Sequence, residues 1–245
     1  MADDNDNSGA PTVVLVHGAF ADSSSWNGVI ERLQAKGVQV RTAANPLRGI
    51  SIDSDYVRAV LDETPGPVLL VGHSYGGAVI TNAAKQAKNV VGLVYVAAFA
   101  PEEGEKLGDA TPESKDSVLN SVLVQLHYPS VNGGAAGVEF AIDPEGFHEA
   151  FAADLPTDQT TLMAATQRPI ADLAFSEETG PPAWKDLPSW TVLATGDKAA
   201  GTDLVRSMAE RAGAKITEVE SSHVVMVSQP DAVTEVISEA LDQVG

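Results

Sequence analysis

The sequence predicts an α/β protein in which helices connect parallel β-strands. Short apolar runs alternate with segments of helical period along much of the 245 residues. The runs are apolar at consecutive positions, as strands buried on both faces of a parallel sheet require. A long interruption between about 101 and 185 breaks this alternation, which then resumes. The length and this pattern predict one large domain carrying an insertion.

Each expected element has its own signal. Six apolar runs predict strands at 12–16, 38–43, 67–72, 90–98, 190–195 and 215–220. Segments of helical period predict helices at 23–36, 52–63, 75–87, 202–213 and 230–243. The last of these has an apolar stripe at i, i+3, i+4, i+7 and i+8, and Ser228 is its expected N-cap.

The segment from about 101 to 185 is rich in Pro, Gly, Ser and acidic residues, with short helical stretches at 117–126 and 158–167. Ligands bind open α/β sheets at the carboxyl ends of the strands, and we expect the insertion to cover that edge as a partly helical cap. The run NGGAAG at 132–137 predicts flexible backbone within the cap. The predicted domain is therefore 11–245, with the cap inserted in it.

Composition excludes several classes of function. Lys and Arg number 15 against 34 Asp and Glu, a formal net charge of −19, which disfavours nucleic acid and anionic membranes as partners. Cysteine is absent, which excludes disulfides, thiolate metal sites and cysteine nucleophiles. The five histidines show no metal-ligand spacing, and neither a metal nor a cofactor is predicted. Residues 1–10 read as a disordered acidic tail without signal-peptide features, and a cytoplasmic location is expected.

The run VGHSYGG at 71–77 lies between a predicted strand and a predicted helix. Gly72, Ser74 and Gly76 match the G-x-S-x-G pattern, in which a serine projects from a sharp turn towards a base. The two glycines relieve crowding between neighbouring main chains at such a turn. The alternative is a glycine-rich anion-binding turn, but no second phosphate-binding motif accompanies it.

A nucleophilic serine needs a base, and in folds with this turn the order along the chain is serine, acid, histidine. His223 follows the last predicted strand and precedes the final helix, so it is the expected base. His17 and His73 precede the serine and are expected to orient a loop and to pack in the turn, respectively. His127 and His148 lie in the cap, where a solvated or structural role is expected and substrate contact stays open.

The acid of such a site follows a late strand, and Asp197 comes directly after the strand predicted at 190–195. Asp203 is the rival, but it lies at a predicted helix start, where a carboxylate satisfies free amides. Asp197 is therefore expected to hold the imidazole in the right tautomer. An acyl-transfer site also needs amide donors for an oxyanion, and Tyr75 and Ala19 are the predicted ones.

The pocket walls are predicted from adjacency to these positions. Gly18, Phe20, Phe99 and Val224 each lie beside a predicted catalytic or oxyanion residue. The side chains of Phe20, Phe99 and Val224 could equally belong to the core. Met163 in the cap is a further candidate, and its helical spacing fits packing against the body as well.

The runs LVHGAF, VGHSYGG, TGDK and SSH occur in this order, and together they resemble the α/β-hydrolase superfamily. The strings HGAFADSSSW, GHSYGG and AAFAP resemble its branch of plant methylesterases and hydroxynitrile lyases, with their bacterial relatives. The resemblance extends from about residue 11 to the end. It implies a six-stranded, mostly parallel sheet with helices on both faces. It also implies Ser74 as nucleophile, His223 as base, Asp197 as acid, and Ala19 and Tyr75 as oxyanion donors.

The lyases of that branch carry a threonine and a lysine where this sequence has Gly18 and Val224. Hydrolysis is therefore the better inference: a serine hydrolase that cleaves carboxylic esters of small to medium apolar substrates through an acyl-enzyme. The alternatives are a cofactor-free perhydrolase or haloperoxidase, a hydroxynitrile-lyase-like enzyme, and a ligand-binding receptor module. The expected partner is a small-molecule ester, and a homodimer is left open.

Overall fold

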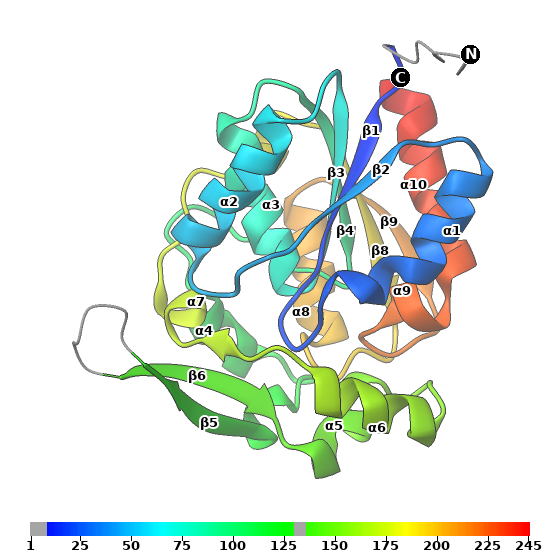
Figure 1. The fold of residues 1–245 in the computed structure, drawn as a ribbon. Coiled ribbons are helices and arrows are strands. Elements are labelled where there is room, and N and C mark those ends of the chain that lie inside the picture. Colours follow the sequence, from blue (N-terminus) through cyan, green and yellow to red (C-terminus); the bar gives the residue numbers. More distant parts are fainter. Residues whose placement is uncertain (1–8, 130–135) are drawn as a thin grey trace.

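A computed structural model describes residues 9–129 and 136–245 (Figure 1). Six strands form one sheet in the order β2-β1-β3-β4-β8-β9, and every pairing within it is parallel. The strands are β1 (Thr12–Val16), β2 (Val40–Ala43), β3 (Val68–His73), β4 (Val90–Val96), β8 (Ser189–Ala194) and β9 (Lys215–Val219). The predicted parallel sheet is confirmed. Strand β3 lies inside the sheet and all of its residues are buried, which explains its continuous apolar sequence.

Helices cover both faces of the sheet. Figure 1 shows α1 and α10 together on one face and α2 and α3 together on the other. The helices of this body are α1 (Asn27–Ala35), α2 (Ile50–Asp62), α3 (Tyr75–Gln86), α8 (Thr202–Arg211), α9 (Val225–Ser228) and α10 (Pro230–Val244). Within the described ranges, no helix is both long and apolar enough to traverse a lipid bilayer.

The last helix starts at Pro230, as predicted, but the predicted N-cap residue is wrong. Ser228 ends the extra helix α9, and the N-cap position of α10 falls on Gln229, which makes no side-chain cap hydrogen bond. The Ser228 hydroxyl instead pairs with that of Ser221 at 3.1 Å. The tertiary contact of Ser228 therefore replaces the local capping role that the sequence favours.

The chain leaves the sheet after β4 and returns to it at β8, and the intervening segment forms the cap (Figure 1). The cap contains α4 (Leu107–Ala110), β5 (Leu123–Tyr128), β6 (Gly137–Ile142), α5 (Pro144–Phe151), α6 (Thr157–Thr166), β7 (Ile170–Ala171) and α7 (Leu173–Ser176). Helix α6 matches the stretch predicted at 158–167. The helix predicted at 117–126 is wrong, because β5 pairs antiparallel with β6 from Leu123↔Ile142 to Tyr128↔Gly137. Most of the run at 132–137, and residues 1–8 of the predicted tail, lie outside the described residues.

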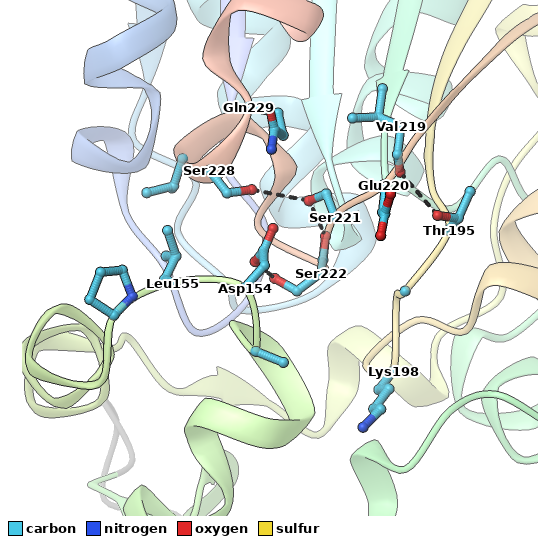
Figure 2. Close-up of a pocket in the computed structure, with 14 residues that line it drawn as sticks. Asp154, Leu155, Thr195, Lys198, Val219, Glu220, Ser221, Ser222, Ser228 and Gln229 are labelled. Carbon is cyan, nitrogen blue, oxygen red and sulfur yellow. Dashed lines mark hydrogen bonds between the residues drawn. The ribbon is translucent and has the colours of Figure 1, made fainter.

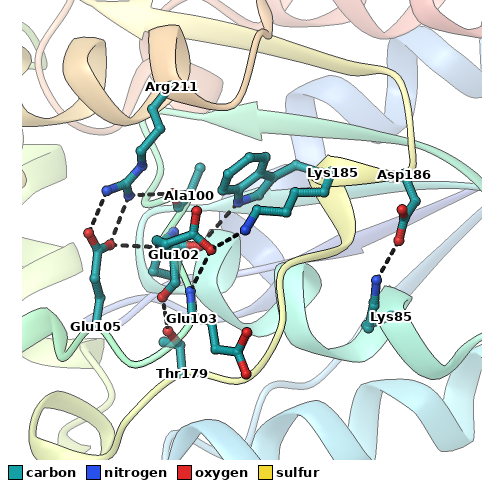
Figure 3. Close-up of polar contacts among 11 residues, drawn as sticks. Lys85, Ala100, Glu102, Glu103, Glu105, Thr179, Lys185, Asp186 and Arg211 are labelled. Carbon is teal, nitrogen blue, oxygen red and sulfur yellow. Dashed lines mark hydrogen bonds and ion pairs between the residues drawn. The ribbon is translucent and has the colours of Figure 1, made fainter.

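Polar contacts join the two ends of the cap to each other and to α8 (Figure 3). Arg211 of α8 forms a two-pronged ion pair with Glu105 at the entry to the cap. Glu102 pairs with Lys185 at the exit, at 2.6 Å, and its carbonyl accepts from the Thr179 hydroxyl, also at 2.6 Å. Ion pairs this exposed add little stability. Their effect is to place the entry and exit of the cap side by side.

Candidate active site

Ser74 forms the whole turn between β3 and α3. Its φ of 53° and ψ of −124° are a strained backbone conformation for a residue with a side chain. An added Cβ at Gly72 would lie 2.6 Å from the carbonyl oxygen of Gly76, and one at Gly76 would lie 2.7 Å from that of Val16. No side chain fits at either glycine, so the crowding that the motif implies is present.

The surrounding main chain holds the strained turn in place. The Ser74 amide donates to the Val96 carbonyl at 3.2 Å, and the Ser74 carbonyl accepts from Gly77 at 2.9 Å and from Phe99 at 3.2 Å. The loop after β1 also packs directly on the turn, since an added Cβ at Gly18 would lie 2.6 Å from the Cβ of Ser74. The serine therefore has rigid support, and it is 6% exposed.

His223 and Asp197 form a buried pair. His223 Nδ1 lies 2.8 Å from Asp197 Oδ2, and both side chains are 1% exposed. Asp197 Oδ1 accepts from the amides of Ala199 at 2.9 Å and Ala200 at 3.0 Å. Because a carboxylate only accepts, His223 carries a proton on Nδ1, and its Nε2 is available as a base.

The turn and the loop that carries His223 are in contact. His73 Nε2 donates to the main-chain carbonyl of His223 at 3.0 Å, and the two imidazole rings lie 4.7 Å apart between centroids. Burial, reinforced by the neighbouring His223, keeps the pKa of His73 well below its usual range, so His73 is neutral. In the described chain no hydrogen bond joins the Ser74 hydroxyl to His223, and such bonds are often long in unliganded sites.

Asp203 has a different role from that of Asp197. It lies in the first turn of α8 and accepts from the Ser114 hydroxyl and from the Lys115 amide, the latter at 2.8 Å. These contacts attach the beginning of the cap to the body. The aspartate that contacts His223 is Asp197.

The two predicted oxyanion donors have free amides. Neither the Ala19 nor the Tyr75 amide donates to another group in the described part of the chain. Tyr75 is also held by its side chain, whose hydroxyl donates to Asp53 at 2.8 Å. Asp53 is fully buried, and this burial raises its pKa although the Arg48 amide and the Tyr75 hydroxyl donate to it. Asp53 was not predicted from the sequence, where its one signal is its place in the first turn of α2.

Arg168, which follows α6 in the cap, supports the loop after β1 and was also missed. Its carbonyl accepts from the Phe20 amide at 3.1 Å, and its guanidinium donates to the Asn45 carbonyl at 3.0 Å. His17 Nδ1 donates to the Gly18 carbonyl at 2.9 Å, which leaves its Nε2 lone pair 3.5 Å from the Arg168 guanidinium. Phe20 has a positive φ of 59°. No motif marks Arg168, because its partners are distant in sequence.

Burial lowers the pKa of His17 from 6.5 to about 4, with Arg168 acting in the same direction and the bond to Gly18 opposing it. As pH falls, the unfolded chain therefore takes up this proton before the folded chain does. We expect the free energy of unfolding to fall between about pH 6.5 and 4, by about 3 kcal/mol from this group. Urea unfolding across that range should show His17→Gln with a weaker pH dependence than the parent. Exposed His127→Gln is the control, and equal slopes for the parent and His17→Gln would contradict the expectation.

Three of the predicted pocket residues, Phe20, Phe99 and Val224, are buried in the hydrophobic core. Phe20 also lines, together with Met163, a cavity of about 180 Å³ between the loop after β1 and α6. Contact of these residues with a substrate stays a prediction. Within residues 9–129 and 136–245, no group of three or more His, Asp or Glu side chains is placed to hold a metal ion.

The cap histidines lie away from Ser74 in the chain and have local partners. His148 Nδ1 pairs with the Thr160 hydroxyl at 3.2 Å, which joins α5 to α6. His127 is exposed on β5, with Gln125 at 3.3 Å. These contacts fit the structural and solvated roles expected for them.

Comparison with known proteins gives consistent results. The model of the alpha/beta hydrolase family matches residues 13–236. A carbendazim hydrolyzing esterase of Nocardioides sp. is 35% identical over an alignment of 114 positions that covers 41% of this chain and 47% of that enzyme, so the match spans about half of the enzyme's length. A pyrethroid hydrolase of Sphingobium wenxiniae is 25% identical over an alignment of 260 positions that covers 94% of this chain and 87% of that enzyme. A methylesterase from Arabidopsis has the same fold, with a TM-score of 0.76, 20% identity, and coverage of 95% and 99%. Since the family match extends from β1 into α10, this chain belongs to the alpha/beta hydrolase family, and the resemblance seen in its motifs is confirmed.

Proposed function

We propose that this protein is a serine hydrolase that cleaves carboxylic esters of small to medium apolar substrates. The observation that carries the proposal is the buried His223–Asp197 pair, whose histidine packs against the residue that precedes Ser74. The strained turn and the free amides of Ala19 and Tyr75 support it. The names of the relatives, a carbendazim hydrolyzing esterase and a pyrethroid hydrolase, add support for ester hydrolysis.

In the proposed first half-reaction, Ser74 Oγ attacks the ester carbonyl carbon and His223 Nε2 takes its proton. Asp197 stabilises the resulting imidazolium without becoming protonated. The negative charge moves to the carbonyl oxygen, which accepts hydrogen bonds from the amides of Ala19 and Tyr75. One such donor is worth about 3–4 kcal/mol of transition-state stabilisation.

The tetrahedral intermediate then collapses. The bond to the alcohol oxygen breaks, and His223 gives its proton to that oxygen, so the alcohol leaves and an acyl-Ser74 ester forms. In the second half-reaction, His223 takes a proton from water as the water oxygen attacks the acyl carbon. The proton returns to Ser74 Oγ, and the carboxylic acid is released.

Two positions that separate hydrolases from the lyases of the similar branch favour hydrolysis. An added Cβ at Gly18 would meet the Ser74 side chain at 2.6 Å, so a threonine cannot be placed there without moving the loop. Val224, next to His223, is fully buried among apolar residues and offers no cation to a departing cyanide. Binding of an ester carbonyl requires neither a threonine at position 18 nor a cation at position 224.

A fluorophosphonate probe tests the proposal directly, because it modifies a serine only where a base and an oxyanion site are in place. We expect one adduct, located on Ser74 by peptide mass spectrometry, and steady release of p-nitrophenol from p-nitrophenyl acetate and butyrate. Failure to label, or an adduct on another serine, would contradict the assignment and favour a receptor module.

A further inference from the structure

An open cavity of about 1050 Å³ lies between the cap and the loop that carries His223 (Figure 2). One wall is the cap segment 153–156, and the opposite wall includes 219–222 and 227–229. Figure 2 shows Asp154 reaching from the cap wall to Ser222, where a dashed line marks their hydrogen bond. The two walls are therefore joined beside the predicted base.

Hydroxyl groups link the loop around His223 to Asp154. The Ser222 hydroxyl donates to Asp154 Oδ1, and Ser222 is buried. The Ser221 hydroxyl donates to the Ser222 carbonyl at 2.8 Å and pairs with the Ser228 hydroxyl at 3.1 Å. Asp154 itself is exposed. Partial desolvation would raise its pKa, but hydrogen bonding to Ser222 outweighs this effect, and the pKa is lowered. Asp154 therefore accepts as a carboxylate at neutral pH.

The same cap segment also packs on the imidazole itself. Phe151 is buried, and its ring centroid lies 5.0 Å from that of His223 at an interplanar angle of 57°. Phe147 and Phe20 hold Phe151, at centroid distances of 5.0 Å and 6.0 Å. Over four residues the cap thus contacts two consecutive residues of the loop: Phe151 packs on His223, and Asp154 binds Ser222.

We propose that Asp154 is a positioning residue that sets the orientation of His223 through Ser222. This proposal rests on the proposed function, in which His223 is the base. The hydrogen bond holds the residue directly before His223, while Phe151 limits where the ring can lie. A displacement of a catalytic group by about 1 Å can lower a rate by about 100-fold, so one such contact is expected to affect the chemical step.

The test measures kcat and KM for p-nitrophenyl butyrate, with active sites counted by fluorophosphonate labelling. Asp154→Ala is expected to lower kcat per active site by about tenfold or more while KM stays within about twofold, because orientation and not binding changes. Asp154→Asn keeps an oxygen that accepts from Ser222 and should recover most of the rate. Asp158→Ala, a loss of an exposed carboxylate on α6, is the matched control and should behave like the parent.

Ser222→Ala and the double variant complete the test. Ser222→Ala should reproduce the loss seen in Asp154→Ala, and the double variant should lose no more than either, because both changes break one contact. An unchanged kcat in Asp154→Ala, a loss confined to KM, or an asparagine variant as slow as the alanine variant would overturn the inference. If the parent is labelled and active, these results contradict only the role of Asp154, and the proposed function is retained. If the parent is not labelled, the proposed function itself is contradicted.

Discussion

Replacing Ser74 with alanine is expected to abolish ester turnover, with kcat falling by about a millionfold. Without the hydroxyl no acyl-enzyme can form, and the oxyanion donors and bound substrate leave only a residual rate. The fold should survive, because alanine has to adopt the same positive φ as serine and adds no atom to the turn. Release of p-nitrophenol from p-nitrophenyl butyrate measures the loss.

Ser238→Ala is the matched control for this change. Ser238 lies on α10, and its hydroxyl donates to the Thr234 carbonyl at 2.8 Å. It should keep the activity of the parent, with equal thermal unfolding midpoints for the two variants. A folded Ser74→Ala protein that turns over ester within about a hundredfold of the parent would exclude Ser74 as the nucleophile.

Asp197→Asn is expected to lower kcat by about 10⁴-fold with little change in KM. The asparagine oxygen can continue to accept from the amides of Ala199 and Ala200, which fixes the amide so that its NH₂ group faces His223 Nδ1. A donor at that position requires an unprotonated Nδ1. The proton of His223 then lies on Nε2, which can no longer take a proton from Ser74.

Asp203→Asn separates this tautomer effect from a general loss of charge. Asp203 contacts Ser114 and Lys115 and not His223, so its asparagine variant should retain the kcat of the parent. Steady-state kinetics on both variants decide the question. A larger loss in Asp203→Asn than in Asp197→Asn would reverse the assignment of the acid.

Much of the body could be predicted from the sequence because its signals are local. Buried parallel strands are apolar throughout, as in β3, and a strained turn can be recognised from the glycines that its crowding requires. The order of serine, acid and histidine along the chain then points to His223. The choice between Asp197 and Asp203 also had a local reason, since only Asp203 occupies a helix start.

The cap was harder to predict because its elements depend on partners that are distant in sequence. Residues 117–126 include helical spacing, yet β5 is stabilised by pairing with β6, and pairing outweighs propensity. Serine is a favoured N-cap residue, yet the Ser228 hydroxyl pairs with that of Ser221 across the loop. Arg168 supports the loop after β1 without any motif that marks it.

By itself, then, the sequence determined the strands of the parallel sheet and the turn at Ser74, because each has a signal within a few neighbouring positions. It also determined the residues proposed for the chemistry, because the order of serine, acid and histidine along the chain points to them. The tertiary structure alone decided that the cap meets the loop of His223, through Phe151 on the ring and Asp154 on Ser222. These contacts join segments about seventy residues apart, and such contacts form only when the sheet and the cap pack together.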